Sequence, residues 1–216
     1  MARILSLQLD PSNGVFEEAA RVLRRSGVIA MPTETFYALG ASTSDKVAIR
    51  RVCAMKERPQ EKPILALIAD RTQLTALVDE VTSAATTLME RFWPGPLTLI
   101  FSASPLLPEV LTSGTGSVGV RQPAHAGLAL LLRQVGPLTG TSANRSGDQP
   151  ARTAEEVQTT LGSEVDLILD GGPTRGGLPS TIVDTVSSIR LLREGPISRH
   201  QIETALNMAG MALGSS

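Results

Sequence analysis

Residues 28–40 read VIAMPTETFYALG and give the first indication of the fold class. The segment opens with an uninterrupted apolar run, 28–31, which is typical of a strand buried on both faces. Gly27 separates this run from residues 16–25, whose apolar positions have the spacing of a helix. A buried strand that directly follows a helix indicates an α/β protein.

The rest of the chain alternates between the same two kinds of segment. We expect strands at 4–9, 28–31, 64–68, 97–101, 118–121, 138–141, 166–169, 181–186 and 189–193. We expect helices at 16–25, 45–54, 71–78, 82–92, 127–134, 153–161 and 198–208. The last two strands are close enough in sequence to pair antiparallel, whereas helical crossovers make parallel neighbours. The sequence therefore predicts an α/β protein, one domain over residues 1–216, with a twisted mixed β-sheet flanked by helices.

The overall composition limits the classes of function. The 216 residues are 42% hydrophobic and carry a net charge of −1, so there is no global basic field to attract nucleic acid. An anion site must therefore come from local clustering of cations. The single cysteine, Cys53, excludes an intrachain disulfide and lies in an apolar pattern that favours burial. The apolar runs are too short to span a membrane and the N-terminus lacks a signal-peptide pattern, so we expect a cytoplasmic protein without a membrane partner.

Two of the chain's three lysines, Lys56 and Lys62, flank Arg58 in the segment KERPQEK. Ammonium and guanidinium groups clustered near a Thr/Glu/Thr run favour a pocket for a strongly anionic ligand, such as a polyphosphate. Pro59 disfavours helical geometry at Arg58, so we expect Lys56 and Arg58 to project to the same side. A solvated basic loop at the end of a helix has the same composition, and this segment alone does not separate the two interpretations.

Three other segments carry small polar side chains that allow both a functional and a structural interpretation. Thr33 and Thr35 have the two-residue spacing that points both hydroxyls to one side of an extended chain, where they could hold a polar substrate. The segment TSANRSG at 141–147 offers hydroxyl and backbone groups to a ligand, although such residues also form turns. Ser180 and Arg193 are expected to face each other across the last two strands, as polar surface pairs often do.

Several familiar catalytic motifs are excluded. GTGSVG at 114–119 matches a dinucleotide-binding pattern, but the expected strand at 118–121 stands where that pattern requires a helix. The chain contains no P-loop and no G-x-S-x-G nucleophile elbow. His125 and His200 lack the spacing of metal ligands, so we expect no metal bound by the protein itself.

Seven segments in a fixed order nevertheless identify a resemblance. They are PTETFYALG (32–40), KERP (56–59), WPGPLT (93–98), SVGVRQPAH (117–125), TSANRSG (141–147), PSTIVD (179–184) and LLREGP (191–196). Each is unspecific alone, but the ordered set resembles the YrdC-like (Sua5/TsaC) family of threonylcarbamoyl-AMP synthases over a core of about residues 12–205. The chain stops before the extra C-terminal domain of longer Sua5-type proteins, so it resembles the short, single-domain form.

The resemblance implies an activity, a fold and partners. Members are nucleotidyltransferases that make L-threonylcarbamoyladenylate from L-threonine, bicarbonate or CO2 and ATP, with Mg²⁺ accompanying ATP and pyrophosphate released. The product supplies the N6-threonylcarbamoyladenosine modification of tRNA, so tRNA or tRNA-modification proteins are candidate partners. The family fold has a concave, basic face.

The family pattern also implies site residues. Threonine would be bound by Thr35, Arg121 and Ser180. The nucleotide would be bound by Arg58, Lys62, Ser117, Ser142, Asn144 and Arg193. Lys56 and Arg58 would form the catalytic K-x-R pair. One position departs from some members, because Leu67 stands where they carry a histidine.

Two alternatives share the resemblance. YrdC-like relatives include carbamoyl-transfer domains of much larger hydrogenase-maturation proteins and proteins of unassigned role, which tend to lack the intact Ser142-Ala143-Asn144 segment. A non-catalytic RNA-binding protein could use the same basic concavity, although the near-neutral charge and the scarcity of aromatic residues disfavour it.

Overall fold

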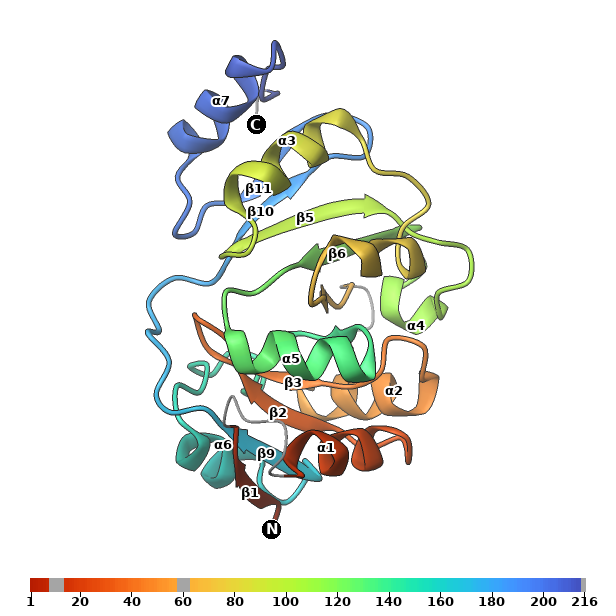
Figure 1. Cartoon of the computed structure of the whole chain (residues 1–216), viewed down its shortest axis with the longest axis vertical. Helices are drawn as coiled ribbons and strands as arrows, with labels where there is room; N and C mark the ends of the chain where they lie inside the picture. The colour runs from red at the N-terminus through yellow and green to blue at the C-terminus, as the bar shows by residue number, and fades with distance from the viewer. Residues whose placement is uncertain (8–13, 58–62, 215–216) are drawn as a thin grey trace.

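The strands form two mixed sheets in the computed structural model, which describes residues 1–7, 14–57 and 63–214 (Figure 1). The first sheet has the order β1 (Arg3–Ser6), β9 (Leu167–Asp170), β2 (Ile29–Pro32), β3 (Tyr37–Gly40) and β8 (Thr141–Ser142). The second has the order β11 (Arg190–Arg193), β10 (Thr181–Asp184), β5 (Leu97–Ser102), β6 (Ser117–Arg121), β4 (Ala66–Leu67) and β7 (Leu138–Thr139). Parallel and antiparallel neighbours occur in both sheets, and the predicted antiparallel pairing of the last two strands, β10 and β11, is confirmed.

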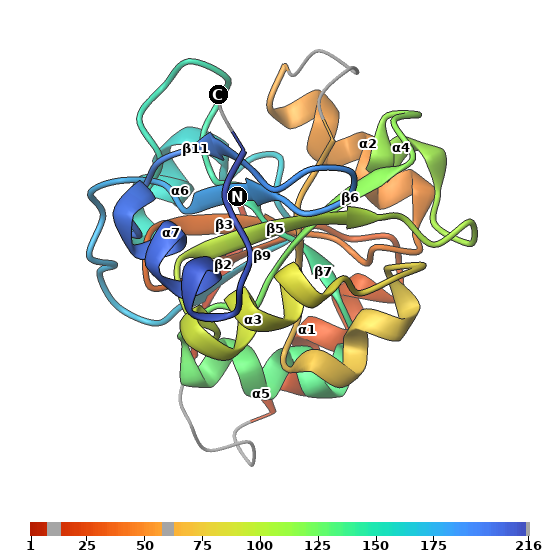
Figure 2. The same cartoon turned by 90° about the horizontal axis from the view of Figure 1, so that it is seen from above.

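The helices of the described residues are α1 (Val15–Leu23), α2 (Lys46–Met55), α3 (Ser83–Phe92), α4 (Glu109–Thr112), α5 (Ala126–Val135), α6 (Ala154–Leu161) and α7 (Arg199–Met208), with a 3₁₀ helix at Arg71–Ala76. Four of them, α1, α2, α5 and α6, cover the two faces of the first sheet, whereas α3 and α7 lie beside β5, β10 and β11 of the second (Figure 1). Figure 2 shows α1 and α5 together on one side of the strands, with α2 and α6 on the other. Every residue of β2 is therefore buried, as its unbroken apolar run predicts.

Two apolar clusters follow from this layering. In one, Ile29 and Met31 pack with apolar residues of α1 and α5. In the other, Val28 and Ala30 pack toward α2 and α6, and the cluster continues into the second sheet. Cys53 packs against this second cluster and is partly buried, so the prediction of a buried residue is confirmed only in part.

The two sheets meet where β7 passes into β8. Only Gly140 separates these strands, and a β-carbon there would lie 2.4 Å from the side chain of Leu67. Thr139 fastens the junction, because its buried hydroxyl donates to the Leu39 carbonyl (2.9 Å) and accepts from the Ala41 amide (2.9 Å). The crossing favours glycine, since a side chain at position 140 would have to displace the buried side chain of Leu67.

The structure confirms the mixed α/β class and refines the expected elements. The strands divide between two sheets where the sequence predicted one, because the expected strand at 138–141 is split at Gly140. The helix expected at 71–78 is a shorter 3₁₀ helix. Two elements were not predicted, β3 and the single turn α4. None of the helices in the described part of the chain has the length and apolar character needed to cross a bilayer.

β3 escaped prediction because residues 32–37 form a tight hairpin turn. The Thr33 amide donates to the Phe36 carbonyl (3.1 Å), and the Thr33 hydroxyl donates to that carbonyl and accepts from the amides of Thr35 and Phe36. The chain then returns antiparallel to β2, with Pro32 opposite Tyr37. Thr33 therefore forms a local turn through hydrogen bonds of its hydroxyl to the backbone.

We predict that Thr139→Val lowers the free energy of unfolding by about 2–4 kcal/mol, because two buried backbone groups lose their partner while the side chain keeps its shape. Urea denaturation would measure the loss. Thr159→Val, at an exposed position of α6, is the matched control and should change stability by less than about 0.5 kcal/mol. A Thr139→Val protein as stable as wild type would show that the sheet junction does not depend on this hydroxyl.

Candidate functional site

Most of the predicted site residues surround one cavity of about 330 Å³, which we call the Arg121 cavity. Its lining includes Thr35, Lys56, Arg121, Ser142, Asn144, Ser180 and Arg193. These residues come from the β2–β3 turn, the end of α2, β6, β8 and its following loop, the approach to β10, and β11. Segments far apart in the sequence therefore converge where the two sheets meet.

Three predicted residues are not placed in this cavity. Ser117 lies at the opposite end of β6 from Arg121 and shares a hydrogen bond of 3.0 Å with the Thr115 hydroxyl. Arg58 and Lys62 lie outside the described residues, although Pro63, the next described residue, lines the cavity.

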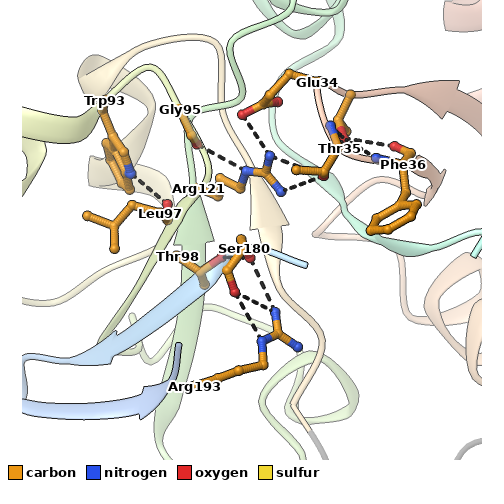
Figure 3. Close-up of polar contacts among 11 residues, drawn as sticks. Glu34, Thr35, Phe36, Trp93, Gly95, Leu97, Thr98, Arg121, Ser180 and Arg193 are labelled. Carbon is orange, nitrogen blue, oxygen red and sulfur yellow. Dashed lines mark hydrogen bonds and ion pairs between the residues drawn. The ribbon is translucent and has the colours of Figure 1, made fainter. Parts of the chain in front are cut away.

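Arg121 forms one wall of the cavity, and its guanidinium is held on several sides (Figure 3). Its Nε donates to the Gly95 carbonyl (3.1 Å), and both Nη atoms donate to the Thr35 hydroxyl at 3.3 Å. Nη2 also lies 2.7 Å from a carboxylate oxygen of Glu34. The Arg121 side chain is only 5% exposed, so these contacts replace the water that a buried cation has lost.

Ser180 and Arg193 form the neighbouring wall, and their predicted contact is confirmed (Figure 3). Arg193 donates to the Ser180 carbonyl from Nε (3.0 Å) and Nη2 (2.8 Å), and Nη2 is 3.3 Å from the Ser180 hydroxyl. That hydroxyl also shares a 2.9 Å hydrogen bond with Thr98. Burial, and then the positive charge of Arg121, lower the pKa of Arg193 from its ordinary value. The guanidinium groups of Arg121 and Arg193 thus line the same cavity.

Lys56 directs its ammonium into the loop after β8. Nζ donates to the carbonyl of Ser142 (2.6 Å) and to the carbonyl and side-chain oxygen of Asn144 (3.0 and 3.1 Å). The Ser142 hydroxyl donates to the same Asn144 oxygen (2.6 Å), and the Asn144 amide donates to the carbonyls of Arg145 and Asp148. We expected this ammonium to project with Arg58 toward a ligand. In the structure it holds the shape of the Ser142–Asn144 segment.

The charged side chains that line the Arg121 cavity in the described part of the chain are all cations: Lys56, Arg121 and Arg193. A cavity with this lining, with hydroxyls from Thr35, Ser142 and Ser180, suits a ligand with more than one anionic group. Leu67 does not contribute, because its side chain is buried against Gly140.

A second cavity, of about 490 Å³, lies on the other side of the Thr33–Thr35 turn, and we call it the His125 cavity. Its lining includes Pro32, Glu34, Gly95, His125, Gly172 and Pro196. His125 Nδ1 accepts from the Leu128 amide (3.2 Å) at the start of α5. Burial lowers the pKa of His125, and the Glu34 carboxylate partly opposes that shift.

Tyr37 fixes the loop that borders the His125 cavity. Its hydroxyl donates to the Gly172 carbonyl (3.0 Å) and to Asp170 (3.2 Å), and the Gly171 amide donates to the hydroxyl oxygen (3.3 Å). Burial and the Asp170 carboxylate raise the pKa of Tyr37, so the phenol remains protonated and continues to donate. The Gly176 amide then donates to the Thr35 carbonyl (2.8 Å), which ties the same loop to the turn.

Sequence reasoning missed Glu34 and Gly95 as site residues. Glu34 stands between two threonines that were selected for their spacing, and Gly95 lies inside the recognised WPGPLT segment. Both contact Arg121 across long stretches of sequence, so no local pattern identified either contact.

Comparisons with known proteins place the chain among relatives of one kind. The Sua5/YciO/YrdC family model, described as "Telomere recombination", matches residues 21–195. Threonylcarbamoyl-AMP synthase of Bacillus subtilis is 39% identical over 203 residues, which are 92% of this chain and 58% of the relative. The protein of that name from Pyrococcus abyssi is also 39% identical, over 87% of this chain and 56% of its own length. The chain thus spans somewhat more than half the length of these two relatives.

Further matches include proteins of similar length to this chain and solved structures. Threonylcarbamoyl-AMP synthase of Chromobacterium violaceum is 39% identical over 85% of this chain and 94% of its own. Among solved structures, Sua5 of P. abyssi complexed with L-threonine has a TM-score of 0.89 at 33% identity, over 99% of this chain and 62% of that one. YciO of E. coli has a TM-score of 0.80 at 28% identity, over 91% and 97% of the two chains.

We predict that Lys56→Met destabilises the protein by about 3 kcal/mol or more, because several buried oxygens lose a charged donor. Amide hydrogen exchange over residues 142–147 should also become faster, and mass spectrometry would measure it. Lys46→Met, at an exposed position of the same helix, is the control and should leave both properties unchanged. Unaltered exchange over 142–147 in Lys56→Met would show that the ammonium does not hold this loop.

Proposed function

Because the chain belongs to the Sua5/YciO/YrdC family, we propose that it synthesises L-threonylcarbamoyladenylate from L-threonine, bicarbonate or CO2 and ATP, with release of pyrophosphate. The observation that carries this proposal is the convergence of Thr35, Arg121, Ser180 and Arg193 on one cavity whose described charged residues are all cations. The substrates include a carboxylate, a carbonate and a triphosphate. A cationic cavity with a hydroxyl-lined end is complementary to that set of charges.

In the proposed reaction, the threonine amine forms a C–N bond to the carbon of bicarbonate with loss of water, or to that of CO2 with loss of a proton, and gives a carbamate. A carbamate oxygen then attacks the α-phosphorus of ATP, and pyrophosphate leaves. This chemistry needs no nucleophilic side chain, so positioning and stabilisation of negative charge supply most of the acceleration. Arg121, Thr35 and Ser180 hold threonine, and Arg193, Ser142 and Asn144 hold the nucleotide.

The remaining predicted roles stay within this proposal. Arg58 and Lys62 contact the ATP phosphates, Ser117 contacts the nucleotide, and Lys56 acts beside Arg58. The described lining of the Arg121 cavity offers no carboxylate, and no group of three His, Cys, Asp or Glu gathers in the described part of the chain. Those residues do not form a protein-held Mg²⁺ site, so we assign Mg²⁺ to the phosphates of ATP.

The proposed product serves the modification of an adenosine in tRNA, which makes tRNA or its modification proteins the proposed downstream partners. ATP and tRNA are cytoplasmic, and we assign the activity to that compartment and to a single YrdC-like domain. The test is ATP turnover to pyrophosphate that requires both threonine and bicarbonate, with serine as the control amino acid. RNA binding that depends on salt, without ATP turnover, would instead support the non-catalytic alternative.

We predict that Arg121→Lys raises the threonine KM by about tenfold or more, because an ammonium cannot make two parallel hydrogen bonds to a carboxylate. The ATP KM should change by less than about threefold, since the substitution keeps the charge of the cavity. Steady-state pyrophosphate release would measure both constants. Arg133→Lys, at an exposed position of α5, is the control. An unchanged threonine KM in Arg121→Lys would remove Arg121 from the threonine site.

A further inference from the structure

Arg121 lies in the partition between the two cavities. Its side chain lines the Arg121 cavity, whereas its partners Gly95 and Glu34 line the His125 cavity. Thr35 borders both cavities. Two of the groups that hold the guanidinium thus line the His125 cavity, while Arg121 itself lines the Arg121 cavity.

The contacts of Arg121 divide according to the edges of its guanidinium group. In any arginine, the N–H of Nε and one N–H of Nη2 point along one edge, and Nη1 and Nη2 form a second edge. The Gly95 carbonyl accepts from Nε on the first edge (3.1 Å), and the Glu34 carboxylate lies 2.7 Å from Nη2 as an ion pair that lacks the geometry of a hydrogen bond. On the second edge the Thr35 hydroxyl stands at 3.3 Å from both Nη atoms, which is long for a hydrogen bond to a charged donor.

The burial of Glu34 costs hydration free energy, which indicates that this side chain has a function. Its carboxylate oxygens have lost essentially all contact with solvent and, within the described residues, their one close cation is Arg121. The side chain as a whole is 17% exposed. Burial of a carboxylate costs hydration free energy, and a single ion pair recovers only part of that cost. Stability alone therefore does not account for the position of Glu34.

We propose that Glu34 is a positioning residue for the reaction. By holding the Nε/Nη2 edge of Arg121, it presents the Nη1/Nη2 edge to the carboxylate of the amino-acid substrate in the Arg121 cavity. The substrate carboxylate takes the place in front of that edge which the Thr35 hydroxyl now occupies at long range, and Thr35 can then donate to it. This inference rests on the function proposed above.

The test compares Glu34→Ala, Glu34→Gln and wild type in the full chain. Alanine removes the anchor, so we expect the threonine KM to rise by about tenfold, the lower end of the contribution of a hydrogen bond to a charged group. Glutamine keeps the size of the side chain but removes the charge, so the ion pair with Nη2 is lost and the threonine KM should also rise by about tenfold. The ATP KM and kcat should change little in both variants, because Glu34 does not contact the nucleotide in this proposal.

A substrate analogue separates positioning from general damage. L-threoninol lacks the carboxylate, so its inhibition constant should be the same in Glu34→Ala and wild type. The ratio of the two inhibition constants describes only the folded protein. It therefore remains informative if the alanine substitution destabilises the chain. Asp166→Asn is the matched control, because it also removes the charge of an ion-paired carboxylate, 2.8 Å from Arg51, but lines neither cavity. It should leave both constants unchanged.

Each outcome decides the question. Equal weakening of threonine and L-threoninol, or threonine binding in Glu34→Ala as tight as in wild type, would overturn the positioning role while the synthase activity stands. Threonine binding in Glu34→Gln as tight as in wild type would show that the charge of Glu34 does not hold Arg121, which also contradicts the proposal. A wild-type protein that binds threonine by calorimetry but releases no pyrophosphate would refute the proposed function alone, and binding would then replace KM in the comparison. A wild type that binds no threonine would overturn both.

Discussion

The structure depends on the burial of the Arg121 guanidinium between segments that lie far apart in the sequence. A buried cation requires acceptors in place of water, and these come from the β2–β3 turn and from the loop before β5. The turn belongs to the first sheet, and Arg121 and that loop belong to the second. The need to solvate one charge therefore brings the two sheets together at the place where the Arg121 cavity forms.

The same principle applies on the opposite side of the cavity. There Lys56, at the end of α2, replaces its water with oxygens of the loop that follows β8. Because β7 and β8 belong to different sheets and only one residue joins them, the position of this loop follows from the sheet junction. The backbone oxygens that replace the water around Lys56 and Arg121 thus fix the shape of the cavity, and Arg121 and Arg193 line it.

Much of this arrangement could be predicted from the sequence, and the reasons for the failures are physical. The alternation of apolar runs and helical spacing predicted most of the elements, and the ordered motifs predicted the residues that surround the Arg121 cavity. Ser117 was assigned to the nucleotide from the family resemblance alone, and it lies at the other end of β6 from Arg121, outside the lining of this cavity. The role of Glu34 depends on an ion pair with a residue in another sheet, and local spacing carries no information about such a pair. The hairpin of Tyr37–Gly40 was missed because the turn before it resembles a loop that leads into a helix.

The contact between Gly140 and Leu67 has a consequence for the family as a whole. The space at this crossing is shared by two positions, and one of them must have no side chain for the other to hold a large one. Relatives that carry an imidazole at the position of Leu67 should therefore retain glycine opposite it, and a substitution at either position should be accompanied by a compensating change at the other. Covariation between these two positions among family members would then reflect the limited space where the chain segments cross and not a shared contact with substrate.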